Sequence, residues 1–192
     1  MLQEKKVLVE KNTKLLGILL LFLSIVSLSA GSLYGEQGKI EKSLKEDIKH
    51  SGTELETNAK DATVWYNKGV TLGKLGRYEE AIKCFDKVLE IAPKNALVWN
   101  SKGLALHNLG RYEEAIKCFD KALEIAPKNA LAWNNKGLAL HNLGRYEEAI
   151  KCFDKALEIE PKNALTWNNK GLALHNLGRY EEAITCFDKA LE

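Results

Sequence analysis

The sequence of 192 residues predicts an all-α fold, in which a solenoid of antiparallel helix pairs follows one N-terminal apolar helix. Three observations predict it. Tryptophan, cysteine and phenylalanine recur every 34 residues through the C-terminal two thirds of the chain, beginning at Trp65, Cys84 and Phe85. Each period holds two helix-length segments separated by a glycine. An uncharged run of 21 residues stands near the N-terminus. A fixed period of this length is typical of a solenoid built from helical hairpins.

The N-terminal apolar run covers residues 15–35 and follows a basic flank, residues 1–14. As a helix it would reach about 31 Å, enough to cross a hydrocarbon core of about 30 Å. We therefore expect a transmembrane anchor or a signal peptide. The length of the run and Tyr34 favour a retained anchor, whereas the small residues at 27–32 suit cleavage, so both readings stay open.

The lysines on the two sides of this run are nearly balanced, but the short N-terminal flank favours a cytoplasmic N-terminus. The sequence thus predicts a single-pass membrane protein with its repeats outside the cytoplasm. The alternative is a protein secreted after signal cleavage.

Residues 36–61 are predicted to be a linker. Ile40, Leu44 and Ile48 recur every four residues, which indicates a short amphipathic helix. Residues 55–61 resemble the end of a repeat and are interpreted as a remnant of one.

Four repeats follow, at residues 62–95, 96–129, 130–163 and, incomplete, 164–192. The second repeat illustrates all four. Residues 96–109 predict one helix, which Gly110 ends, because glycine readily adopts the left-handed conformation at a helix C-terminus. Residues 111–125 predict the next helix, which Pro127 stops. Gly103 lies beside Trp99 on the helical wheel and lets the partner helix approach closely.

The pattern within each repeat resembles the tetratricopeptide repeat (TPR) family, whose members carry Trp, Gly, Ala, an aromatic residue, Ala and Pro in this order. The second repeat supplies them as Trp99, Gly103, Ala115, Phe119, Ala122 and Pro127. The chain departs from the family where leucine is usual and lysine stands instead, at Lys68, Lys102, Lys136 and Lys170. The resemblance implies a right-handed superhelical solenoid whose first helices line a concave groove for a partner peptide or helix.

By that resemblance, the candidate groove residues are asparagines, histidines and leucines of the first helices. They are Asn100, Leu104, His107, Asn108, Asn134, Leu138, His141, Asn142, Asn168, Leu172, His175 and Asn176. Side-chain amides suit a peptide backbone, since each offers both a donor and an acceptor. The alternative is a solvated polar face produced by repetition of one unit. Gly73 interrupts the histidine series in the first repeat.

The four cysteines match no metal-binding pair, and stacked hairpins place equivalent residues near 10 Å apart, too far for a disulfide. We expect buried thiols, no metal and no cofactor. No nucleophile–base pair, phosphate loop or carboxylate pair stands out, so an enzyme is not expected. The net charge of +2 argues against a nucleic-acid partner.

The sequence therefore predicts a protein–protein interaction scaffold or adaptor, tethered at a membrane through residues 15–35. The alternative is a structural protein that self-associates through its uncapped C-terminal repeat into a homo-oligomer.

Overall fold

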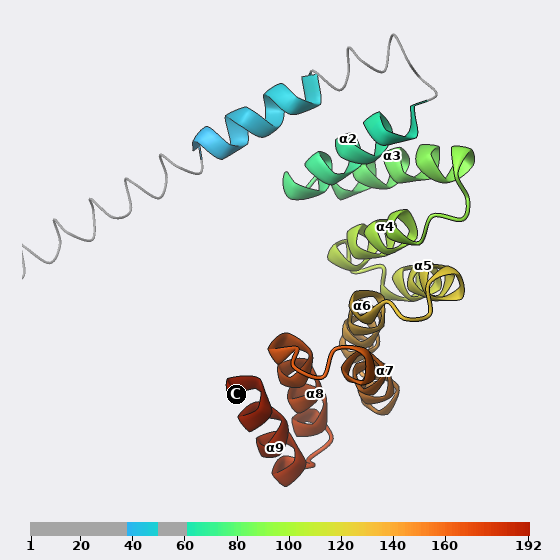
Figure 1. Ribbon diagram of the computed structural model, residues 1–192. Helices are drawn as coiled ribbons and strands as arrows, with labels where there is room; N and C mark the ends of the chain where they lie inside the picture. The colour runs from blue at the N-terminus through green and yellow to red at the C-terminus, as the bar shows by residue number, and fades with distance from the viewer. Residues whose placement is uncertain (1–37, 50–60) are drawn as a thin grey trace, which may run out of the picture. The chain divides into compact units, whose positions relative to one another are not determined.

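The computed structural model describes residues 38–49 and 61–192. Residues 38–49 are helical. Residues 61–192 form helix pairs joined by short turns, which follow one another in chain order (Figure 1). The first helices of the pairs are α2 (Ala62–Lys74), α4 (Ala96–Asn108), α6 (Ala130–Asn142) and α8 (Ala164–Asn176). The second helices are α3 (Tyr78–Ile91), α5 (Tyr112–Ile125), α7 (Tyr146–Ile159) and α9 (Tyr180–Leu191). The predicted all-α solenoid is confirmed for this part of the chain.

The turn inside each pair depends on a glycine. Gly110 has a φ of 75°, in the left-handed region, and its equivalents in the other pairs have φ values of 74–76°. The Gly110 N–H donates to the His107 carbonyl and the Arg111 N–H to the Leu106 carbonyl, both at 2.9 Å, so the last carbonyls of α4 are satisfied. The predicted helix stop at Gly110 is therefore confirmed.

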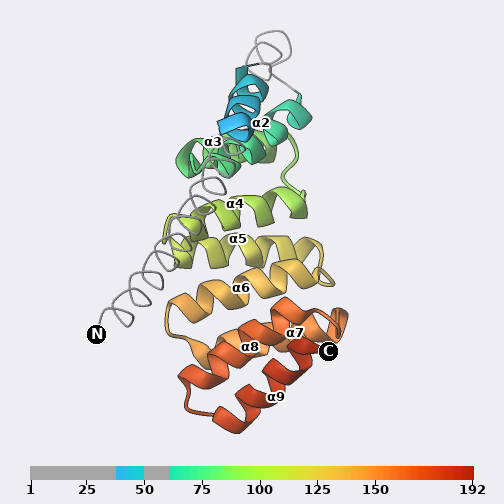
Figure 2. The ribbon, with the colours of Figure 1, turned by 90° about the vertical axis from the view of Figure 1, so that its left-hand side faces the viewer.

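The turn between pairs is held by the recurring tryptophan and asparagine. The Asn129 side chain caps α6 by accepting from the Ala132 N–H at 3.0 Å. The Trp133 indole N–H donates to the Pro127 carbonyl at 2.9 Å. The same bond, from an indole to the proline carbonyl six residues earlier, is made by Trp99 and Trp167. The tryptophan thus ties each first helix to the turn that precedes it, and Figure 2 shows the pairs following one another from α2 to α9.

Close approach within each pair explains the glycine of the first helix. A Cβ atom added at Gly103 would lie 2.6 Å from Cε1 of Phe119, whose side chain is fully buried. No heavy atom tolerates that distance without displacement, so Gly103 lets α4 and α5 pack against each other. This confirms the close approach predicted from the sequence.

The lysines that replace the family's leucine make specific contacts between pairs. Lys102 Nζ on α4 lies 2.6 Å from Asp86 Oδ1 on α3 and 5.6 Å from the centroid of the Trp99 ring. Lys136 and Lys170 pair in the same way with Asp120 and Asp154. Each of these three lysines therefore holds its ammonium over its own tryptophan ring and pairs it with an aspartate of the preceding pair.

The four cysteines are free and buried, as expected. Burial raises the pKa of the Cys118 thiol to about 11, and that of Cys152 equally to about 11. The thiols therefore stay protonated at neutral pH and fill the packing between helices as small apolar side chains.

The predicted localisation, a single-pass membrane protein with its repeats outside the cytoplasm, is wrong on this structure. In residues 38–49 and 61–192 no helix combines the length and apolar composition needed to span a bilayer, because the repeat helices have 12 to 14 residues and carry charged side chains. The predicted transmembrane anchor or signal peptide, residues 15–35, lies outside the described residues.

Candidate functional site

The first helices of the last three pairs present leucines to solvent in two rows. Leu97, Leu131 and Leu165 are 54%, 57% and 62% exposed, and Leu104 and Leu172 are 44% and 45% exposed. The two leucines of one helix are seven residues apart, so they lie on the same side of it. We call this surface the leucine face; it consists of the exposed Leu97, Leu104, Leu131, Leu165 and Leu172, together with Leu138, which is partly buried.

Sequence reasoning found only one of the two rows. Leu104, Leu138 and Leu172 were among the expected groove residues, whereas Leu97, Leu131 and Leu165 were not. The signal was present, because a spacing of seven residues returns to the same side of a helix.

Asn100 and Asn134, two of the expected groove residues, are buried instead. They are only 5% and 4% exposed. Asn135 Nδ2 donates to Asn100 Oδ1 at 3.2 Å, and Asn169 Nδ2 donates to Asn134 Oδ1 at 3.0 Å. Their carboxamides therefore hold adjacent first helices together, and a partner cannot reach them.

Histidine and asparagine form a second series of contacts between first helices. Asn142 Nδ2 lies 2.9 Å from His107 Nε2, and Asn176 Nδ2 lies 2.8 Å from His141 Nε2. An amide nitrogen donates, so Nε2 of each histidine accepts, and for His107 this requires a neutral ring. Burial lowers the pKa of His107, which agrees with a neutral ring. The His107 ring also meets the Tyr112 ring edge-on, with centroids 5.2 Å apart.

The end of the described stack differs from its middle. Asn168 and His175, both expected groove residues, are exposed on α8. No further helix pair follows them within the described residues, so they lack the neighbour that engages Asn134 and His141. Asn108, at the other end of the series, faces a first repeat that has Gly73 where the later repeats have histidine.

The chain belongs to the class of helical repeat proteins, and more narrowly to the tetratricopeptide repeat family. Two models described as "Tetratricopeptide repeat" match it, one at residues 60–128 and the other at residues 130–163 and 164–192. A comparison with curated protein sequences gave no significant match.

Solved structures of TPR proteins resemble the chain over most of its length. MamA residues 41 to the end, from Desulfovibrio magneticus RS-1, is 25% identical with a TM-score of 0.73, over 78% of this chain and 84% of that one. A MamA structure designated AMB-1 is 28% identical with a TM-score of 0.63, over 77% and 95%. YrrB, described as "a TPR protein with an unusual peptide-binding site", is 25% identical with a TM-score of 0.66, over 78% and 77%. TPR proteins generally mediate protein–protein interactions, which is the function class the sequence predicts.

Proposed function

We propose that the chain is a binding module which holds an extended or helical segment of a partner protein along the leucine face. The observation that carries the proposal is the pair of leucine rows: Leu97, Leu131 and Leu165 are exposed in three successive repeats, and Leu104 and Leu172 in two of them. Large contiguous apolar surfaces on soluble proteins mark interaction sites. The description of YrrB as peptide-binding supports the same class of ligand.

The polar residues of the proposed site flank these rows. Asn108, Asn142 and Asn176 are exposed, and a side-chain amide can both donate to and accept from a peptide backbone. Asn168 and His175 add exposed polar groups on α8. Asn100 and Asn134 belong to the interior and are left out of the proposed site.

The leucines supply the affinity in this arrangement. Full burial of a leucine side chain is worth about 1.5 to 3 kcal/mol, and Leu97 and Leu131 have about half of theirs left to bury. Covering both would contribute about 2 kcal/mol, which corresponds to roughly 30-fold in affinity.

The proposal is tested by selecting peptides from a random display library on the full chain and measuring their affinity by fluorescence anisotropy. Replacing Leu97 and Leu131 together by serine should weaken binding at least tenfold. The matched control replaces Ile125 and Ile159, exposed isoleucines at the ends of second helices, by serine and should leave binding unchanged. Equal loss in both double variants, or no selected peptide, would contradict the proposed site.

Self-association is the second candidate function. On α9, Ile184 is 58% exposed, whereas its equivalent Ile150 on α7 is 8% exposed under the following pair. If a second copy covers this surface, light scattering of the full chain should show a mass that rises with concentration. Ile184→Lys should abolish the rise, and Ile159→Lys, the same change at another exposed isoleucine, should not. A wild-type mass that stays that of a monomer would eliminate this candidate.

A further inference from the structure

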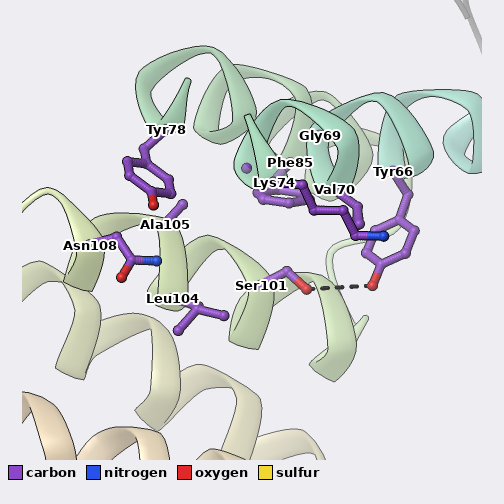
Figure 3. A pocket seen from close by; sticks show the side chains of 11 residues that line it. Tyr66, Gly69, Val70, Lys74, Tyr78, Phe85, Ser101, Leu104, Ala105 and Asn108 are labelled. Atoms are coloured by element: carbon purple, nitrogen blue, oxygen red, sulfur yellow. Dashed lines mark hydrogen bonds between the residues drawn. The ribbon is translucent and has the colours of Figure 1, made fainter. Parts of the chain in front are cut away.

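The contact between the first two repeats contains a pocket of about 350 Å³ on the same side of the first helices as the leucine face. Its lining comes from α2, α3 and α4. Figure 3 shows Tyr78 at one end and Tyr66 at the other, with Phe85 between them. Val70, Leu104 and Ala105 complete the apolar walls. Three aromatic rings therefore surround one opening.

Gly73 opens this pocket. One repeat further on, the equivalent residue is His107, whose ring lies between Tyr112 and Asn142, at 5.2 Å from the tyrosine ring and 2.9 Å from the amide nitrogen. In the first repeat, a Cβ added at Gly73 would have no heavy atom within 4 Å. The space that an imidazole fills in later repeats is therefore empty between Tyr78 and Asn108.

The opposite end of the pocket also carries residues that differ from those of the later repeats. The later repeats pair two asparagines there, whereas the first contact pairs a tyrosine with a serine: Tyr66 Oη lies 3.5 Å from Ser101 Oγ (Figure 3). The Tyr66 ring also packs against Phe85, with centroids 6.0 Å apart. The contact between the first two repeats thus has a tyrosine, a serine and a glycine where the later contacts have three polar side chains.

The charge at the rim is positive. Lys74 is the charged residue among the described side chains that line the pocket, and it stands where the later repeats have asparagine. Its ammonium reaches over the opening toward Tyr66 in Figure 3. No carboxylate is among these lining residues to neutralise it.

We propose that this pocket binds one aromatic side chain of the partner, next to a carboxylate that pairs with Lys74. Aromatic rings favour edge and offset contacts with other rings at 4.5–7 Å, and the three lining rings offer them. The proposal rests on the proposed function, because the pocket gives direction and selectivity to a segment lying on the leucine face. Since the later repeats lack the Gly73 opening, this pocket marks the α2 end of the face.

The test uses capped dipeptides and nuclear magnetic resonance of the ¹⁵N-labelled full chain. Acetyl-Asp-Phe-amide should shift the amide signals of Gly69, Gly73 and Ala105 saturably. Acetyl-Asp-Ala-amide should not shift them, and acetyl-Lys-Phe-amide should bind about three-fold more weakly, the effect of one solvent-exposed ion pair. Lys74→Glu should reverse the order of the two Phe peptides. Shifts that do not saturate, or that spread equally over all repeats, would overturn the proposal.

Gly73→His is the decisive variant, since it gives the first repeat the residue of the later ones in a space that accepts it. It should abolish binding of the dipeptide, while His107→Gly, the reverse exchange one repeat further on, should keep it. Unchanged binding to Gly73→His would refute the pocket. A dipeptide is too short to span the leucine rows, so the two proposals can fail separately. If the dipeptide binds but replacing Leu97 and Leu131 by serine does not weaken the selected peptides, the proposed function is refuted and the pocket is not.

Discussion

Replacing Asn100 by alanine should destabilise the repeat stack, because the side chain joins two first helices in the interior. Asn100 is 5% exposed, and its Oδ1 accepts from Asn135 Nδ2 at 3.2 Å. Alanine removes the acceptor and leaves the Asn135 amide buried without a partner. Such a loss costs about 1 to 3 kcal/mol, more than the net worth of one hydrogen bond, because the desolvated donor is not compensated.

Asn168 provides the matched control, since it occupies the same position of its repeat but is exposed on α8. Asn168→Ala should change the free energy of unfolding by less than about 0.5 kcal/mol. Urea unfolding of the full chain, followed by circular dichroism at 222 nm, measures both variants. The double variant Asn100→Ala with Asn135→Ala should recover part of the loss, because no unpaired amide remains. Equal effects of the two single variants would refute the reasoning.

Three further predictions concern packing, thiols and ion pairs. Gly73→Ala should stabilise the chain by about 1 kcal/mol, because the added Cβ meets open space. Gly103→Ala should destabilise it by about 1 to 2 kcal/mol, because the added Cβ would lie 2.6 Å from a buried phenylalanine ring. The urea midpoints of the two variants measure the difference. Burial raises the pKa of Cys118 and Cys152 to about 11 from 9.0, so the protonated thiols contribute fully to the free energy of unfolding below pH 9. That contribution is lost as the pH rises from 9 to 11. In the double variant Cys118→Ala with Cys152→Ala, the free energy of unfolding measured between pH 9 and 11 should no longer show this pH dependence. Lys136→Met keeps the stem and removes a half-exposed ion pair, so the unfolding free energy should change by less than about 1 kcal/mol and its salt dependence should diminish.

The helices and turns of the repeats could be predicted from the sequence because local chemistry determines them. Gly110 adopts a positive φ that other residues resist, and Pro127 cannot continue a helix. The period then implied that every copy repeats the same hairpin, and the structure agrees from α2 to α9.

The candidate site could be predicted only in part, because burial depends on the neighbouring repeat. Leu104, expected in the groove, is 44% exposed, while Leu97, which was not expected there, is 54% exposed. Asn100 was expected in the groove and lies in the interior. The helical wheel of a single helix cannot distinguish a side chain that faces solvent from one that faces the next helix.

The sequence by itself determined the class of fold and the turns that end the repeat helices, since these depend on short-range propensities and on the 34-residue period. Only the tertiary structure decided which copy of a repeated residue does what. Asn134 and Asn168 have nearly the same local sequence, yet one is buried and the other exposed, because a following pair covers only the first. In the sequence, Gly73 only interrupts the histidine series. In the structure it lines a pocket, because no imidazole fills the space between α2 and α4 there.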